Sequence, residues 1–322
     1  MPPPTKNRSV SSFHMKAVIY KSTGSWYLVR SEEGKFYNAR IKGIFKIDGI
    51  TSTNPLAVGD EVTISFEGDA ADNVIITNIS ERRNYIARSS PHNRMQHHII
   101  AANIDQSLLF VTLRDPKTSQ GFIDRFLITS EAFHVPSVIV FNKSDLYKNK
   151  EMEKYRELSA IYREIGYKVL LISLENGEGV NGLEEILRGK TTLLSGHSGT
   201  GKSTFVNGIF PDLALRTREV SDWSGKGMHT TTFTEMYDLP FGGRIIDTPG
   251  IREFGITGIP RQELSHYFPE MRVMLTKCQF NNCLHLNEPG CAVKRGVEDG
   301  IISEQRYQSY CNILESVTDR NY

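Results

Sequence analysis

The feature that most constrains the fold of this 322-residue chain is the glycine-rich segment "SGHSGTGKST" at residues 195–204. It follows the apolar run "TTLL" and precedes a helical stretch, and it fits the pattern G-x-x-x-x-G-K-[ST], whose backbone N–H groups surround a phosphate chain. A plain Gly/Ser turn is the alternative, but four fixed positions with both flanking elements favour a nucleotide-binding α/β domain. The pattern leaves ATPases, kinases and GTPases open. The predicted nucleotide-binding residues of this loop are Gly196, His197, Ser198, Gly199, Thr200, Gly201, Lys202, Ser203 and Thr204, with Lys202 on the outer phosphates and Ser203 on Mg²⁺.

Hydropathy predicts three domains after a Pro/Ser-rich leader at residues 1–14, which we expect to be disordered. Residues 15–83 carry about five short alternating segments without a helical pattern, which predicts an OB-like β-barrel. Residues 84–254 alternate apolar strands with helical stretches, which predicts an α/β domain with a mostly parallel sheet. Residues 255–322 predict a mostly helical domain around a cluster of cysteines and a histidine.

Composition excludes some classes of protein. No stretch approaches the roughly 18 uninterrupted apolar residues of a membrane-spanning helix, and the start "MPPPTKNRSVSSFH" has no apolar signal region, so a cytoplasmic protein with no membrane partner is expected. Four cysteines are too few for a disulfide framework, and the three between positions 278 and 291 indicate a metal site. The net charge of +1 argues neither for nor against nucleic acid.

The base is indicated by a second motif, Asn142-Lys143-Ser144-Asp145, directly after the apolar strand "SVIVF". A ligand-facing loop is expected at the carboxyl end of such a parallel strand. The Asp145 carboxylate can accept hydrogen bonds from N1–H and the 2-amino group of guanine, which adenine does not offer in that arrangement. A surface turn is the alternative, but "ISL" at residues 172–174, with Ser173, resembles the short loop that backs the base. We therefore predict GTP and GDP as the nucleotides.

A third motif, Asp247-Thr248-Pro249-Gly250, ends another predicted strand. Asp247 is expected to hold the Mg²⁺ shell through water, and Gly250 to sense the γ-phosphate. Small GTPases place the phosphate loop and this motif before N-K-x-D and the base-backing loop, whereas here the last two come first. The chain is therefore predicted to be circularly permuted. The permutation leaves the Asp247–Gly250 segment immediately before the Cys/His block, to which a nucleotide-dependent movement could pass directly.

These features together resemble the RsgA (YjeQ) family of bacterial ribosome-small-subunit-dependent GTPases. The resemblance rests on the permuted order, the N-terminal barrel, "GKGMHTTT" between the phosphate loop and D-T-P-G, and C-x4-C-x-H-x5-C after it. It covers nearly the whole chain after residue 14. It implies hydrolysis of GTP to GDP and phosphate, stimulated by the small (30S) ribosomal subunit late in its maturation, followed by release. The implied partners are that subunit, with its 16S rRNA and assembly factors, and the chain is expected to be a monomer.

The Cys/His cluster predicts one structural zinc ion. Cys278, Cys283, His285 and Cys291 supply three thiolates and one imidazole, the ligand set of a closed tetrahedral site. Three buried cysteines that merely lie close together are the alternative, which the turn-prone residues between them disfavour. Cys311 falls outside the cluster, on a helical stretch, and is expected to be a small buried hydrophobe.

The residue that aligns the attacking water is the least determined part of the site. In Ras-like enzymes a glutamine follows the D-x-x-G glycine, but here that position is Ile251. The candidate is His229, which precedes Thr230, Thr231 and Thr232, and to which the family resemblance also gives a catalytic role. A solvent-exposed loop histidine is the alternative. One of the threonines, for which we take Thr231, should supply a hydroxyl to Mg²⁺, although the sequence does not choose among the three.

Two other functions stay open at this stage. A regulatory switch that binds a protein effector, with hydrolysis incidental, would share every nucleotide-binding motif; another permuted GTPase, acting on the large subunit, is disfavoured by the barrel and the zinc pattern together. The segment "ERRNYIARSSPHNRMQHH", with Arg82, Arg83, Arg88 and Arg94, is equally compatible with an RNA-binding patch and with a solvated linker.

Overall fold

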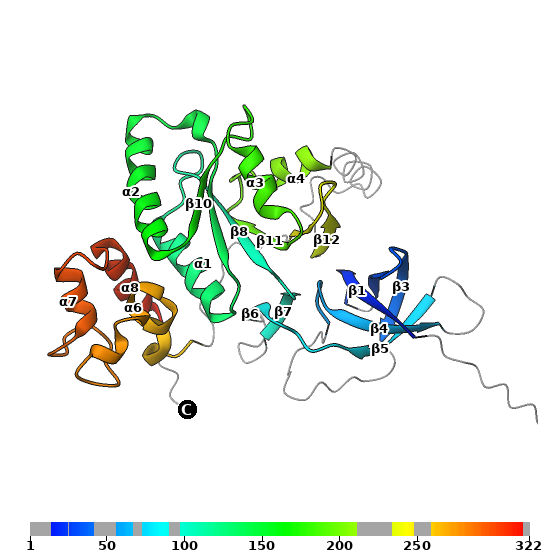
Figure 1. Ribbon diagram of the computed structural model, residues 1–322, viewed down its shortest axis with the longest axis horizontal. Coiled ribbons are helices and arrows are strands. Elements are labelled where there is room, and N and C mark those ends of the chain that lie inside the picture. The colour runs from blue at the N-terminus through cyan, green and yellow to red at the C-terminus, as the bar shows by residue number, and fades with distance from the viewer. Residues whose placement is uncertain are drawn as a thin grey trace, which may run out of the picture.

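The computed structural model describes residues 14–24, 26–41, 56–66, 73–89, 97–210, 234–247 and 259–317. A barrel, a central sheet covered by helices, and a helical C-terminal body occupy separate regions of the molecule (Figure 1). This is the predicted architecture, although the domain boundary at residues 83/84 stays a prediction. Residues 1–13 of the predicted leader (1–14) and the boundary at residues 254/255 lie outside the described residues, whereas His14 of that leader begins the first strand of the barrel.

The N-terminal body is a closed five-stranded barrel, as predicted. Its strands are β1 (His14–Ser22), β2 (Tyr27–Ser31), β3 (Phe36–Ile41), β4 (Glu61–Phe66) and β5 (Asn73–Ile79). The strands pair in the order β1-β2-β3-β5-β4, and β4 pairs again with β1, which closes the barrel. Only the β3–β5 pair is parallel among these pairs. Alternate residues such as Ile19, Val29 and Ile64 fill the interior, which is why the sequence shows period-two alternation.

A hairpin of β6 (Tyr85–Ser89) and β7 (His97–Ala102) connects the barrel to the central sheet. Gly59 of the barrel lies against it at φ +94°, where an added Cβ would be 2.1 Å from the Ala102 carbonyl oxygen, so only glycine fits. The buried carboxylate of Asp60 accepts two hydrogen bonds from the guanidinium of Arg82, at 2.6 Å each. Arg82 therefore stabilises this connection. That arrangement argues against an RNA contact for this arginine of the basic segment.

The central sheet has the strand order β10-β9-β8-β11-β13-β12. The bounds are β8 (Gln106–Val111), β9 (Ser137–Phe141), β10 (Lys168–Leu171), β11 (Thr191–Gly196), β12 (Glu235–Asp238) and β13 (Arg244–Asp247). All pairs are parallel except β12–β13. The five parallel strands are those that the sequence predicted, whereas the four-residue β12 was not identified. Because the connections run in permuted order, each predicted motif still ends a strand of one ordinary α/β sheet.

Helices cover both faces of this sheet. They are α1 (Gln120–Ala132), α2 (Asn149–Ile165), α3 (Val180–Leu187) and α4 (Lys202–Ile209). Side chains of α1 and α2 share one apolar cluster with β8, β9 and β11, whereas α3 and α4 share a second cluster with alternate residues of the same strands. The two-sided burial explains the continuous apolar runs of these strands. Among the described residues, no helix is both long and apolar enough to cross a membrane.

The C-terminal body packs against α1 and α2. It consists of short helices η2 (Arg261–Tyr267), α6 (Pro269–Arg272), η3 (Leu275–Lys277) and α7 (Ala292–Glu298), followed by α8 (Glu304–Ser316). Its contact with the central domain contains a fully buried arginine, Arg306 of α8, whose guanidinium pairs with Asp124 of α1 at 2.6 Å and with Glu270 of α6 at 2.7 Å. Asp124 also accepts a hydrogen bond from the hydroxyl of Tyr162 in α2, at 2.8 Å.

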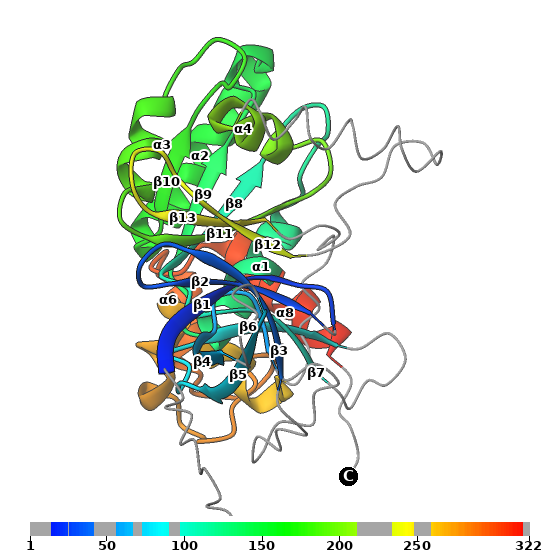
Figure 2. The ribbon, with the colours of Figure 1, turned by 90° about the vertical axis from the view of Figure 1, so that its right-hand side faces the viewer.

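The barrel and the central sheet are joined edge to edge. Strand β1 pairs antiparallel with β12 at Lys21 and Glu235, so the two sheets form one eleven-stranded sheet. Figure 2 shows β1 and β2 lying directly beside β12. Strand β1 therefore pairs both with strands of the barrel and with β12 of the central domain.

Candidate nucleotide-binding site and metal centre

The phosphate-loop segment has the conformation that its glycines allow. It joins β11 to α4, and Gly196, Gly199 and Gly201 have φ angles of +135°, +82° and +104°. A Cβ on Gly196 would be 2.3 Å from the carbonyl oxygen of Phe110, and one on Gly201 would be 2.1 Å from the side-chain nitrogen of Asn142. The glycines therefore allow strand β8 and the N-K-S-D loop to approach the backbone of this turn.

The ammonium group of Lys202 lies inside this turn. It donates to the carbonyl oxygens of Gly196 at 2.6 Å and His197 at 2.7 Å. Burial lowers the pKa of this lysine, which the negative charge of Asp247 opposes. Asp247 ends β13 and lies in register with Leu194 of β11. A cation is thus held between the turn and the carboxylate, where the outer phosphates and Mg²⁺ are predicted to bind.

Asn142 joins the three loops of the predicted site. Its side chain is buried, donates to the carbonyl oxygen of Thr200 in the phosphate loop at 2.9 Å, and accepts from the N–H of Leu174 at 3.3 Å. Leu174 belongs to the "ISL" segment after β10. One amide group therefore fixes the distance between the predicted phosphate and base subsites.

Tyr147 holds the backbone of Asn142, and sequence reasoning did not identify it. Its hydroxyl donates to the carbonyl oxygen of Asn142 at 2.9 Å and accepts from the N–H of Leu113 at 3.0 Å. Burial raises the pKa of Tyr147 to about 12, so the hydroxyl stays protonated and can donate. The hydroxyl therefore connects the loop that follows β9 with the loop that follows β8, just past the last paired residues of these two strands. The only signal in the sequence is a tyrosine two positions after N-K-S-D.

The predicted base subsite is arranged around Asp145. The buried Ser173 hydroxyl donates to one Asp145 carboxylate oxygen at 2.5 Å, while the aspartate itself is exposed to solvent. Lys143 has a left-handed backbone with φ +65°, and its ammonium donates to the carbonyl oxygen of Asp115 at 2.5 Å. The carboxylate is thus oriented by one hydrogen bond and open on its outer side, as recognition of guanine N1–H and 2-NH₂ would require.

The remaining predicted residues divide into described and undescribed ones. The imidazole of His197 stacks on the ring of Phe122 at the start of α1, with centroids 3.7 Å apart. Ser203 and Thr204 are exposed on the first turn of α4. The backbone N–H of Ser144 donates to the carbonyl oxygen of Ile172 at 3.1 Å, so a hydrogen bond connects the N-K-S-D loop to the base-backing loop. His229, Thr230–Thr232, Gly250 and Ile251 lie outside the described residues.

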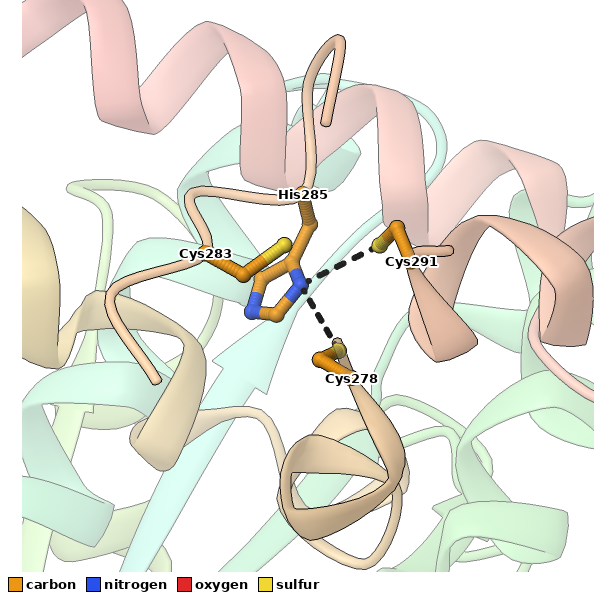
Figure 3. A group of neighbouring side chains, drawn as sticks. All are labelled: Cys278, Cys283, His285 and Cys291. Atoms are coloured by element: carbon orange, nitrogen blue, oxygen red, sulfur yellow. Dashed lines mark hydrogen bonds between the residues drawn. The ribbon is translucent and has the colours of Figure 1, made fainter. Parts of the chain in front are cut away.

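The predicted zinc ligands converge in the C-terminal body. The sulfur atoms of Cys278, Cys283 and Cys291 and a ring nitrogen of His285 all lie within 4.8 Å of one another, as Figure 3 shows. Nδ1 of His285 is 3.4 Å from the sulfur of Cys291 and 3.7 Å from that of Cys278. With Zn–S of about 2.3 Å and Zn–N of about 2.0–2.1 Å, tetrahedral angles require about 3.6 Å between N and S. The donor set and these two N–S distances are therefore compatible with zinc.

The loop that carries His285 is held by groups outside the predicted ligand set. His285 has a left-handed backbone with φ +60°, and its carbonyl oxygen accepts from the Tyr307 hydroxyl of α8 at 2.6 Å. The Glu288 carboxylate accepts from the N–H groups of Leu284 and Leu286, each at 2.8 Å. Burial raises the pKa of the Cys283 thiol to about 12 and lowers that of His285. A divalent cation that binds the thiolates would offset this cost of burying charge.

Comparison with known families and proteins gives a consistent result over nearly the whole chain. Residues 79–257 match the model of the RsgA GTPase family, and residues 16–74 match that of the RsgA N-terminal domain. A protein of Christiangramia forsetii, named small ribosomal subunit biogenesis GTPase RsgA, is 50% identical over 96% of this chain and 98% of its own length. One of the same name from Cytophaga hutchinsonii is 54% identical over 93% of this chain and 98% of its own length.

Two solved structures are similar to this chain in fold and in sequence. The crystal structure of YjeQ from Thermotoga maritima is 32% identical with a TM-score of 0.77, and the match covers 96% of this chain and all of that one. YloQ, described as a circularly permuted GTPase, is 30% identical with a TM-score of 0.73 over 100% of this chain and 99% of its own. These matches confirm the permuted architecture inferred from the motif order.

Proposed function

The chain belongs to the RsgA family of GTPases, and on that basis we propose that it hydrolyses GTP on the small ribosomal subunit, late in the maturation of that subunit. The names of its relatives give them a GTPase function in biogenesis of the small ribosomal subunit. The proposed place of action is the cytoplasm, with the chain acting as a monomer on 16S rRNA and assembly factors. Turnover is proposed to depend on the subunit, so that GTP hydrolysis sets the moment at which the protein leaves the subunit.

The observation that carries the GTPase proposal is the bonding of Asn142. Its side chain contacts the phosphate loop through Thr200 and the base-backing loop through Leu174, although those loops come later in the chain. A phosphate loop alone would suit several nucleotides, and an N-K-x-D sequence alone would suit a surface turn. Their direct contact supports one site for a single guanine nucleotide.

The described residues have separate proposed roles. Lys202 neutralises the outer phosphates, and backbone N–H groups of residues 196–204 surround them. Asp145, oriented by Ser173, accepts from the guanine edge. When bound, Mg²⁺ neutralises charge between the phosphates; the Ser203 hydroxyl and, through water, Asp247 are the groups of this chain that would hold it. The Cys/His cluster is proposed to bind one structural zinc ion. Its four protein donors would fill all four positions of a tetrahedral zinc ion, which leaves no position for a substrate.

His229 is proposed to align the attacking water, because Ile251 has no hydrogen-bonding side chain at the position where Ras-like enzymes have glutamine. We expect the His229→Ala variant to bind GTP and the small subunit nearly normally. Its subunit-stimulated hydrolysis should fall by about 10²-fold or more, the scale of a positioned catalytic group. Full stimulated turnover in this variant would instead assign the catalytic group to the ribosome.

The test of the proposal is phosphate release from GTP with no ribosome, with purified small subunits and with purified large subunits. We expect acceleration by small subunits alone. Lys202→Ala is the control for background hydrolysis in the subunit preparation, because it removes the charge on the phosphates. Equal rates in all three conditions would support the alternative, a regulatory switch for a protein effector. Acceleration by large subunits alone would contradict the assignment of the subunit.

A further inference from the structure

The seam between the barrel and the central sheet involves β12, which follows one predicted nucleotide-sensing segment in the sequence, while its hairpin partner β13 precedes the other. Strand β12 begins at Glu235, three positions after Thr232, and the hairpin partner β13 ends at Asp247. Glu235 lies in register with Asp247 on one side and with Lys21 of β1 on the other. Residues that face each other across paired strands point to the same side of a sheet. A single row therefore runs from the barrel to the aspartate of the predicted Mg²⁺ shell.

Both ends of β12 are bonded to the barrel. At the first end, the ammonium of Lys21 forms a 3.0 Å ion pair with the Glu235 carboxylate. At the other end, Asp238 accepts a 2.7 Å hydrogen bond from the hydroxyl of the buried Tyr20, and it pairs with the guanidinium of Arg30 at 3.0 Å. Since Tyr20 and Arg30 belong to β1 and β2, the barrel contacts both ends of this four-residue strand.

The charged contacts of the seam are of a kind that can separate and re-form. The Lys21 and Glu235 side chains are 36% and 21% exposed, and such pairs contribute little to stability. A cavity of about 330 Å³ opens beside the seam, lined in part by Tyr20 and Arg30 of the barrel and Arg244 of β13. The contact between the C-terminal body and α1 differs, because Arg306 and Asp124 are fully buried there.

The edge of an α/β sheet is also where another chain can add a strand, because its N–H and C=O groups are unpaired. Here β1 of the same chain pairs with that edge. We propose that the barrel, a fold whose strand face and loops bind oligonucleotides, is a built-in effector of this GTPase. Through the β1–β12 seam, binding of the small subunit's RNA to the barrel and the nucleotide state at the Asp247 end of the row influence each other. The inference rests on the proposed function, because it names a route by which the subunit stimulates turnover.

A charge-swap cycle at Lys21 and Glu235 tests this route. Phosphate release is measured with and without small subunits for the parent, Lys21→Glu, Glu235→Lys and the double variant, and each stimulated rate is divided by the same protein's unstimulated rate. We expect each single variant to lower this stimulation at least fivefold and the double variant to restore it to within twofold of the parent. Tyr20→Phe, which removes one hydroxyl and keeps the ring, should lower it two- to fivefold.

Other outcomes of the cycle would overturn the inference. Full stimulation in both single variants and in Tyr20→Phe would show that the seam transmits nothing. A double variant as impaired as Lys21→Glu would show that the lysine acts through its charge on the ribosome and not through Glu235.

Hydrogen exchange without ribosomes separates this inference from the proposed function. The coupling predicts that amide exchange in residues 14–22 differs between the GTP-bound and GDP-bound parent, and that the difference is lost in Lys21→Glu. If exchange responds to the nucleotide in this way but small subunits do not accelerate turnover, the proposed function fails and the coupling stands. If subunits accelerate turnover but exchange in β1 ignores the nucleotide, the coupling is wrong.

Discussion

Replacement of Arg306 by methionine should loosen the C-terminal body from α1 before it affects nucleotide binding. The guanidinium is fully buried and is the cation between two carboxylates, Asp124 at 2.6 Å and Glu270 at 2.7 Å. It also lies over the ring of Phe268, 4.6 Å from the centroid. Methionine fills part of the volume but leaves both carboxylates without this charge.

The size of the effect follows from that burial. Removal of one partner from a buried ion pair costs about 3–5 kcal/mol, because the remaining charge stays in a site of low polarity. For a folding unit of about 60–100 residues, the size of the C-terminal body, each 1 kcal/mol lowers the melting temperature by about 4–8 °C, which gives a decrease of about 12–40 °C for unfolding of that body. Arg272 offers a matched control at the same interface: its pair with Glu131 is 3.2 Å long, but its side chain is 51% exposed. Arg272→Met should cost about 1 kcal/mol or less.

The assay is thermal unfolding combined with limited proteolysis of the full chain. Arg306→Met should release a C-terminal fragment that begins near residue 259 at a lower temperature than the parent does, while GTP affinity at low temperature stays unchanged. Neutralisation of the remaining carboxylates, in Arg306→Met with Asp124→Asn and Glu270→Gln, should recover most of the loss. Equal melting of Arg306→Met and Arg272→Met would refute the reasoning that the buried charges hold this interface.

Two further perturbations test other parts of the account. Native protein purified without chelator should contain about one zinc ion per chain. The Cys283→Ser variant should lose this zinc, and it should lose protease resistance after residue 259 before its GTP binding is affected. An undiminished zinc content in that variant would contradict the four-ligand site. Tyr147→Phe should lower the affinity for GTP and for GDP equally, by about 5- to 10-fold, because the hydroxyl that holds Asn142 is worth about 1 kcal/mol. The stimulated turnover at saturating GTP should stay unchanged. Equilibrium binding and a comparison of KM with kcat check this, and a fall in kcat alone would contradict a role in positioning the base.

The parts of the site that the sequence predicted are those encoded by local patterns. The phosphate loop and N-K-S-D have fixed spacings next to apolar strands, so the residues at positions 142–145 and 196–204 could be placed without coordinates. The four predicted zinc ligands lie within fourteen positions of one another for the same reason. Period-two alternation predicted the barrel strands because each strand has one face inside the barrel.

The parts that the sequence did not predict depend on contacts between distant segments. Arg306 and Asp124 are 182 positions apart, and Tyr20 and Asp238 are 218 apart, so neither pair leaves a local pattern. Strand β12 is only four residues long, too short to show a period. The sequence placed Arg82 in either an RNA-binding patch or a solvated linker, because nothing in it indicates that Asp60 is buried beside this arginine. For Arg306, Asp238 and Arg82, the tertiary contact decides the role of the charge.

The most direct test of the central claim, that this chain's own site hydrolyses GTP on the small subunit, is a change of base specificity at Asp145. Xanthine has a 2-oxo group in place of the 2-amino group, so the Asp145→Asn amide can donate where the carboxylate accepted. Loss of the guanine contacts should cost about 2–4 kcal/mol, or about 30- to 1000-fold in GTP affinity. Phosphate release by this variant with small subunits should therefore be fast with XTP and slow with GTP, the reverse of the parent. Equal preference for GTP in both proteins would contradict the account, because hydrolysis would then occur at another site or in another protein.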